Sequence, residues 1–432
     1  MRISALLLCV CILLTGCSNP FADYRETEHL LVIQTMGIDR ESGGVRLSLA
    51  ASSEGVGNAP RVLAASGETV AEAMERIYDY SFEDEVFCYN VKNVLIGESA
   101  AEEGIEEFLG FICRSPEMRL DVPVFIVKGR SAEQIITGAG DDERGISDIM
   151  QSVQQKLKRR GGTPFTGVDI LRSLKRGGSA LVCALSLDEA SEEVPEDKEE
   201  KTSGQSGGES TGQSGGDTAG QNGTDTAGQS GGEDKSILPS PAAESEPPAA
   251  PEANEQGMTA ASAGYAVIRD GKLCKYIDVR EAVAADMLLN RSGVHEIEVN
   301  DLYGSRVTLE VTNASSSFSP RWDGDTLTGQ EVHISAQYSV LETFGHSELE
   351  SAQYTDALTA ALETELLSRV GAVLASTGDL KADFLSLGSS VERSRPEKYR
   401  SMKARFPELL AGLEFQVTVS CRLKHTNDMK DL

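Results

Sequence analysis

One stretch near the end of the chain decides how its C-terminal part folds: residues 413–424, Leu-Glu-Phe-Gln-Val-Thr-Val-Ser-Cys-Arg-Leu-Lys. Apolar and polar residues alternate through the whole stretch, which is the two-residue period of a β-strand. We therefore predict that this strand completes a sheet with one buried and one wet face. The buried face would carry Leu413, Phe415, Val417, Val419, Cys421 and Leu423.

A long helix is predicted ahead of this strand, over residues 350–375. Its apolar residues recur at helical spacing and form one stripe, which core packing explains; a ligand groove is the alternative interpretation. The stripe consists of Tyr354, Leu358, Leu362, Leu366 and Val370. A second helix is predicted after Pro396.

The segment before the long helix alternates short strands with tight turns. Asp270-Gly271 separates two strand-like runs within residues 265–277, which predicts a hairpin. A helix over 279–289 and strands over 294–299, 306–311 and 330–340 follow. Acidic residues flank the turn at Asp323-Gly324, but their spacing does not match a calcium-binding loop. The C-terminal region is therefore predicted as an α+β domain with an antiparallel sheet and one long helix.

The N-terminal region shows a different order, in which strands alternate with helices. Strands are predicted over residues 29–33, 45–49, 91–97, 122–127 and 180–187, and helices over 69–80, 100–113 and from 131. Such alternation indicates a mixed sheet covered by helices. The predicted fold class of the whole chain is α+β.

Between these regions the composition changes abruptly. Residues 188–262 contain almost no large apolar side chains, and an eight-residue Gly/Ser-rich unit recurs four times from Gly204. Such a segment cannot bury enough apolar surface to offset its ordering entropy, so we predict a disordered linker. Residues 188–256 hold 17 acids and 3 lysines, a net charge of −14, which is half of the −28 of the whole chain.

The start of the chain predicts export and lipidation. Arg2 precedes the apolar run 3–14, and small residues lead directly to Cys17. This is the pattern of a secretory signal, and the run is shorter than the roughly 20 residues of a membrane-spanning helix. The stretch Leu-Thr-Gly-Cys also resembles the bacterial lipobox, and on that resemblance Cys17 carries a lipid; an ordinary signal peptide with a chance cysteine is the alternative.

These observations divide the chain into five parts. They are a lipoprotein signal peptide (1–16), a lipidated tether (17–28), an N-terminal mixed region with up to two subdomains (29–187), the linker (188–262) and a C-terminal domain (263–432). The net charge of −28 argues against nucleic-acid binding. Five cysteines remain after the signal and Cys17, without a close-spaced pair, so buried free thiols are favoured over a disulfide framework.

One basic segment departs from this acidic character. Residues 151–176 contain seven basic residues against the single acid Asp169. The functional interpretation is a patch that faces anionic lipid headgroups or an acidic partner, and the alternative is a solvated helix face. The seven residues are Lys156, Lys158, Arg159, Arg160, Arg172, Lys175 and Arg176.

The order of segments resembles the Ger(x)C lipoproteins, the C subunits of nutrient germinant receptors in endospore-forming bacteria. The residues that carry the resemblance are Asp23-Tyr24-Arg25-Glu26, Met36-Gly37-Ile38-Asp39, Gly67 to Ala73, Val94 to Glu98, Gly264 to Ile268, Gly271-Lys272-Leu273, Ala382-Asp383-Phe384-Leu385 and the terminal strand. The sequence departs from the family at Ser18-Asn19 and Tyr89-Asn90, where a Trp and a His are usual, and the linker is similar to an insertion between the family's two halves.

The resemblance implies a non-enzymatic subunit, lipid-anchored to the outer face of the inner spore membrane, that acts with the integral membrane A and B subunits in nutrient-triggered germination. It implies no cofactor. The residues agree, because the five histidines form no metal-spaced pair. Copies of the G-x-S-x-G pattern occur only in the repeats, which lack the strand-to-helix turn that such a serine needs. A solute-binding lipoprotein that captures a small nutrient remains the alternative function.

Overall fold

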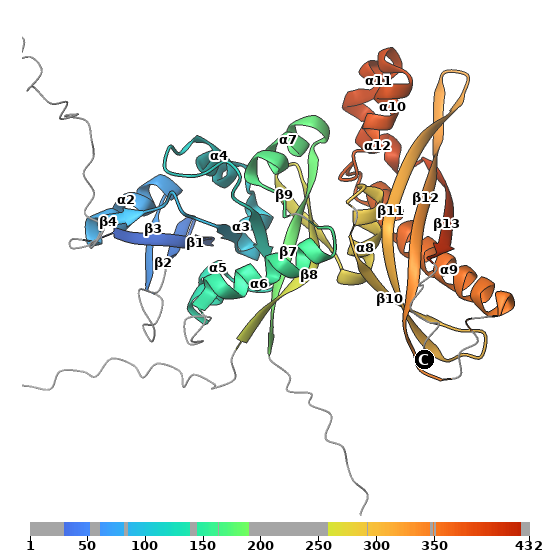
Figure 1. The fold of residues 1–432 in the computed structure, drawn as a ribbon. Helices are drawn as coiled ribbons and strands as arrows, with labels where there is room; N and C mark the ends of the chain where they lie inside the picture. Colours follow the sequence, from blue (N-terminus) through green and yellow to red (C-terminus); the bar gives the residue numbers. More distant parts are fainter. Residues whose placement is uncertain are drawn as a thin grey trace, which may run out of the picture. The chain divides into compact units, whose positions relative to one another are not determined.

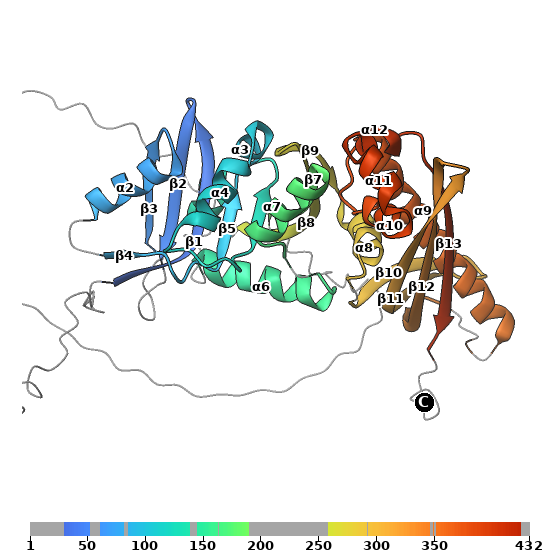
Figure 2. The same ribbon diagram turned by 90° about the horizontal axis from the view of Figure 1, so that it is seen from above.

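A computed structural model describes residues 30–51, 61–81, 85–138, 145–162, 164–189, 258–291, 293–345, 349 and 351–424. The predicted signal peptide, the predicted lipidation site Cys17, the predicted tether and nearly all of the linker lie outside these residues. Figures 1 and 2 show the chain from two directions.

Nine strands of the described chain form one mixed sheet, in the order β3-β2-β1-β5-β6-β7-β8-β9, with β4 paired to β1. Pairs β1–β5, β5–β6 and β6–β7 are parallel, whereas β1–β2, β2–β3, β7–β8 and β8–β9 are antiparallel. The strands are β1 (Leu30–Glu41), β2 (Gly44–Ala51), β3 (Val62–Gly67), β4 (Glu85–Phe87), β5 (Asn93–Ile96), β6 (Val124–Val127), β7 (Ser179–Glu189), β8 (Met258–Arg269) and β9 (Lys272–Ile277).

Helices cover both faces of this sheet, as the sequence predicts. Phe125 and Val127 of β6 belong to a core formed with α5 and α6, whereas Val124 and Ile126 point into a second core formed with α2, α3, α4 and α7. Burial on both faces explains why β6 reads as a continuous apolar run. The helices are α2 (Val70–Tyr80), α3 (Glu98–Glu103), α4 (Glu106–Arg114), α5 (Ala132–Gly138), α6 (Gly145–Arg159) and α7 (Gly167–Gly177).

Local sequence signals account for the first hairpin and the first helix. Ser42 and Gly43 have φ values of 48° and 85°, so the β1–β2 turn is left-handed at both positions, the geometry that favours glycine. Thr69 caps α2, because its side chain accepts a hydrogen bond from the backbone N–H of Glu72. The predicted strand over residues 45–49 and the predicted helix over residues 69–80 are both confirmed.

The predicted helix over residues 100–113 is wrong in one respect, because the structure has two helices there. Gly104 adopts φ 145° and ends α3, and the chain turns before α4 begins at Glu106. The backbone N–H of Ile105 then donates to the carbonyl of Gly271, at 2.8 Å, in the β8–β9 turn. A helix through Gly104 could not make this contact. The inward positions Ile105, Phe108 and Leu109 are buried as predicted.

The sheet continues beyond the linker, which changes the predicted division at residue 263. β8 begins at Met258 and pairs antiparallel with β7 from Glu189↔Met258 to Ser179↔Arg269. The two strands that follow the linker therefore belong to the N-terminal sheet. The physical reason is that without β8 the buried strand β7 would leave a row of unpaired backbone groups at its edge.

A second sheet of the described chain contains four strands in the order β10-β11-β12-β13. It is antiparallel except for its last pair, because β13 runs parallel to β12 from Gly329↔Glu414 to Tyr338↔Leu423. A parallel pair needs a long crossover, and the helices from α9 to α12 supply it. The elements are α8 (Val279–Leu288), β10 (His295–Asn300), β11 (Arg306–Asp323), β12 (Thr326–Thr343), α9 (Ala352–Asp379), α10 (Gly388–Ser394), α11 (Pro396–Met402), a 3₁₀ turn (Lys403–Arg405), α12 (Phe406–Leu410) and β13 (Glu414–Leu423).

The predicted stripe of α9 is confirmed as core. All five of its side chains are fully buried, and four of them pack in one cluster with residues of β10, β11 and β12. On the terminal strand the predicted alternation is also present. Phe415, Val417 and Val419 are half-buried, whereas Gln416 and Thr418 are exposed, so this edge strand contributes a partly covered face.

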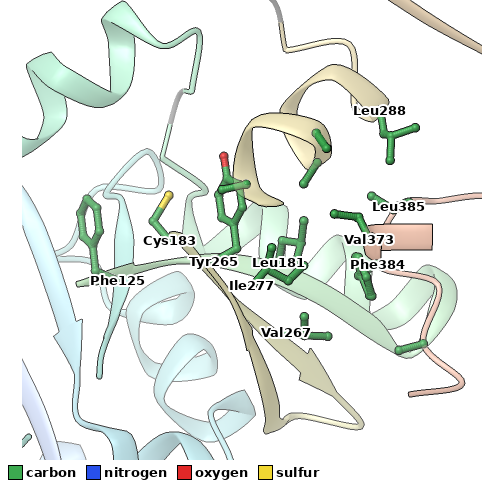
Figure 3. Close-up of a cluster of buried hydrophobic side chains, with 14 of the residues drawn as sticks. Phe125, Leu181, Cys183, Tyr265, Val267, Ile277, Leu288, Val373, Phe384 and Leu385 are labelled. Atoms are coloured by element: carbon green, nitrogen blue, oxygen red, sulfur yellow. The ribbon is translucent and has the colours of Figure 1, made fainter. Parts of the chain in front are cut away.

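The largest core cluster joins the two regions. Leu181, Cys183, Tyr265 and Val267 of the first sheet share it with Leu288 of α8 and with Val373, Phe384 and Leu385 of the later segments, and Figure 3 shows these side chains converging. Burial of apolar side chains contributes on the order of 1.5–3 kcal/mol each. The described residues before and after the linker therefore form one packed unit.

Two leucines of α9 test the packing of the second sheet. Leu362 is fully buried, whereas Leu367, on the same helix, is 44% exposed. We expect Leu362→Ala to lower the free energy of unfolding by about 2–5 kcal/mol and Leu367→Ala to change it by less than about 0.5 kcal/mol. Urea denaturation of both variants measures this difference, and equal losses would contradict the assigned orientation of α9.

Candidate functional site

The seven basic residues predicted as a patch lie on two helices. Lys156, Lys158 and Arg159 occupy the last turn of α6, and Arg160 follows directly. The other three, Arg172, Lys175 and Arg176, lie on α7.

The α7 residues do not join the α6 residues around one groove. Thr166 and Asp169 form a capping box at the start of α7, and Arg172 pairs with Asp169 at 3.1 Å. Lys175 and Arg176 lie in the last turn, where positive charge interacts favourably with the helix dipole. A structural role thus accounts for the α7 part.

A groove of about 960 Å³ opens at the end of α6. We name it the α6–α8 groove. Three of the predicted residues line it, and Arg280 and Arg369 from elements far along the chain join them. Its described lining comprises Lys156, Arg159, Arg160, Val279, Arg280, Val283, Val294, His295, Glu296, Glu298, Thr308 and Arg369.

Close backbone packing fixes the end of α6 against the segment that leads to β10. The N–H of Val294 donates to the carbonyl of Arg159 at 3.0 Å. A Cβ on Gly293 would collide with the backbone of Arg160 and Gly161, so only glycine permits this approach. This contact brings the basic end of α6 next to His295.

The cations of the groove differ in how they are neutralised. Glu365 of α9 pairs with Arg369 at 2.7 Å and with Arg280 at 3.1 Å. Burial acts to raise the pKa of Glu365, but the bonds and charges of the two arginines outweigh it and lower the pKa. By contrast, Lys156, Arg159 and Arg160 have no ion pair with any residue in the described part of the chain.

His295 is buried beside these arginines. Its side chain is 2% exposed, and neither ring nitrogen has a hydrogen-bond partner among the described residues. Burial, followed by the positive charges of Arg160 and Arg369, lowers its pKa to about 4. His295 is therefore neutral at pH 7.

A buried polar cluster adjoins the groove. The hydroxyl of Tyr265 donates to Asp286 at 2.5 Å, and Arg291 lies 3.9 Å from the same carboxylate. Burial raises the pKa of Asp286 to about 6, although Tyr265, Arg291 and Arg160 all act to lower it. The guanidinium of Arg291 also stacks over the ring of Phe165 at 4.2 Å. This cluster fixes α8 to the first sheet.

No arrangement typical of a metal centre occurs in the part of the chain that the structure describes. His295 and His333 lie in separate places, and the remaining histidines and all G-x-S-x-G copies lie outside the described residues. Asp325, at the tip of the β11–β12 hairpin, pairs with Lys398 at 2.6 Å. The five cysteines of the body are unpaired, as favoured from the sequence, but the expected burial holds only for Cys88 and Cys183. Cys113 and Cys421 are half-buried, and Cys274 is exposed.

Within the described ranges, no helix combines the length and the apolar character that a membrane span requires.

The patch predicted from the sequence includes Lys156, Arg159 and Arg160 of this groove but not Arg280, His295 and Arg369. No local signal marks these three, because each lies in an otherwise ordinary helix or strand. Only tertiary packing brings them beside α6.

Comparison with known proteins gives two family matches. Residues 23–187 match the "Spore germination protein N-terminal domain", and residues 263–427 match the family described as "Spore germination B3/ GerAC like, C-terminal". A solved structure, the "Crystal Structure of the GerBC protein", is similar at 14% identity and a TM-score of 0.49, covering 90% of this chain and 97% of that chain. No curated protein sequence matches the chain.

The buried imidazole predicts a pH dependence of stability. The pKa of His295 is about 4 in the folded protein and about 6.5 in an unfolded chain. Between these values the unfolded state binds more protons, so this group lowers stability as the pH falls from 6.5 to 4. We expect the His295→Leu variant to avoid up to about 3 kcal/mol of that loss. The measurement is the free energy of unfolding of wild type and variant at pH 7 and at pH 4, and the difference between the two proteins should change between these pH values. A constant difference would contradict a buried neutral His295.

Proposed function

Because the chain belongs to the Ger(x)C family of spore germination proteins, we propose that it is the membrane-anchored C subunit of a nutrient germinant receptor. The observation that carries the proposal is that both halves of the family occur in order within one chain, at residues 23–187 and 263–427. A role in spore germination follows from the family, and the anchor and the partners are the finer part of the proposal.

The position of the linker supports this assignment. It separates the two matched regions, yet it leaves β7 at Glu189 and returns to β8 at Met258, and these two residues are paired neighbours. An insertion there enters and leaves at one point of the sheet, so it need not disturb the family fold.

The proposed attachment is a lipid on Cys17, at the outer face of the inner spore membrane. The signal pattern and lipobox of residues 1–17 support it. Each buried lipid methylene contributes about 0.8 kcal/mol, and stable anchoring takes more than one acyl chain. Several chains on one cysteine meet that requirement.

The proposed role is non-catalytic and rests on association with the integral membrane A and B subunits. Several polar residues described above support it, since structural hydrogen bonds and ion pairs, within helices or between elements, account for Asp169, Arg172, Tyr265, Asp286, Glu365 and Arg369. The alternative is a lipoprotein that captures a small nutrient, and the family match favours the receptor role over it.

Replacement of Cys17 tests the anchor. We expect Cys17→Ala to be lost from the membrane fraction of cells that lack the A and B subunits, because the lipid is the proposed attachment. Cys113→Ala, which removes a half-buried thiol, serves as the matched control and should remain in the membrane fraction. If the Cys17 variant stays membrane-bound in those cells, the lipid is not the anchor.

Purification from spore membranes tests the partners. A tagged form of this chain, solubilised in mild detergent, should recover two multi-pass membrane proteins, and deletion of its gene should abolish germination on the nutrient that this receptor senses. Two results together would refute the receptor role. The intact chain would be recovered without either membrane protein, and the deletion strain would germinate normally on every nutrient tested.

A further inference from the structure

We propose that the α6–α8 groove is a binding site for a small molecule that carries two or more phosphate or carboxylate groups. The inference depends on the charges and burial around the groove and is independent of the proposed receptor function.

The charge of the groove is opposite to that of the protein. Five cations line it, Lys156, Arg159, Arg160, Arg280 and Arg369, against Glu296 and Glu298. Glu365 adds a third carboxylate at its border, which leaves the surroundings positive in a chain of net charge −28. A concave site of one sign concentrates ligands of the opposite sign.

The placement of the five cations around the groove is not explained by helix stabilisation alone. Positive residues in the last turn of α6 alone would be explained by the helix dipole. Arg280 comes from α8 and Arg369 from α9, however, and neither lies at the C-terminus of its helix. Three separate elements thus present cations to one groove.

Part of this charge is available to a ligand. Glu365 engages Arg280 and Arg369, whereas Lys156, Arg159 and Arg160 have no ion pair with a described residue. Arginine presents several N–H donors in a planar fork that matches the oxygens of phosphate and carboxylate. A ligand with two anionic groups would meet the unpaired cations with one group and the α8–α9 side with the other.

His295 is the second observation that indicates a ligand. It lines the groove and is almost fully buried, yet both its ring nitrogens lack a partner among the described residues. Buried polar groups are nearly always hydrogen-bonded, and an exception calls for an explanation. An oxyanion held between Arg160 and Arg369 would accept a hydrogen bond from the imidazole.

The volume fits a small molecule. Sites for small ligands typically measure about 300–1,000 Å³, and the groove measures about 960 Å³. The same chemistry is offered by a soluble polyanion and by the headgroup of an anionic phospholipid. Because α6 precedes the linker and α8, β10 and α9 follow it, the bound anion would connect the two regions of the fold.

Calorimetric titration with pyrophosphate tests the site. All samples are the full chain with Cys17→Ala, so that the lipid does not contribute. The double variant Arg159→Gln/Arg160→Gln should weaken pyrophosphate binding at least about tenfold, since each charge-assisted bond contributes to affinity. The control Lys175→Gln/Arg176→Gln removes the same charge from α7 and should leave the affinity within about twofold.

The imidazole of His295 gives a second measurement. An anion nearby favours the protonated form, so saturating pyrophosphate should raise the pKa of His295 in NMR titrations. The charged groups that act on it are Arg160, which follows α6, and Arg369 of α9. Glu296 and Glu298 of its own strand also line the groove, but they alternate with His295 and lie on the exposed face of β10. An unchanged pKa would show that the anion does not reach this side chain.

Vesicles distinguish the two sources of the anionic group. The groove binds a lipid headgroup if the protein binds phosphatidylglycerol vesicles but not phosphatidylcholine vesicles. This binding should be displaced by pyrophosphate and lost in the Arg159→Gln/Arg160→Gln variant, which we call the α6 double variant. Pyrophosphate binding without vesicle binding assigns it to a soluble anion. Absence of both, or equal weakening by the α6 and α7 double variants, would overturn the proposal.

Discussion

The antiparallel pairing of β7 with β8 is the constraint on which the rest of the structure depends. It joins residues 179–189 to residues 258–269 across the linker and buries Leu181 and Val267 in the largest core cluster. From β8 the chain continues through β9 into α8, which carries that core to the second sheet. The two regions therefore share side chains, and loss of either one exposes apolar surface of the other.

The sequence predicted most elements whose signal is local. Period-two alternation identified β13, helical spacing identified the buried stripe of α9, and Asp270-Gly271 marked the β8–β9 turn. What it could not show depends on contacts between distant segments. Neither the break of the helix at Gly104, which serves a contact to Gly271, nor the placement of Arg280 and Arg369 beside α6 has a local cause.

Two of the short motifs shared with the family have structural explanations. Asp39 of β1 is buried and accepts hydrogen bonds from the backbone N–H groups of Ala132 and Glu133, which caps the start of α5. Asp383 accepts from the N–H groups of Leu387 and Gly388 ahead of α10, and its burial raises its pKa to about 7. Asp39 and Asp383 therefore have a structural role, and neither residue lines the α6–α8 groove.

The burial of the cysteines determines how the folded protein reacts with thiol reagents. Burial raises the pKa of Cys88, Cys183 and Cys421 to about 12, and only the thiolate is a good nucleophile. Of the five cysteines that the structure describes, Cys274 on β9 is the exposed one. A fluorescent maleimide applied to the native body would thus mark β9, an edge strand of the first sheet, and report on its surroundings without further engineering.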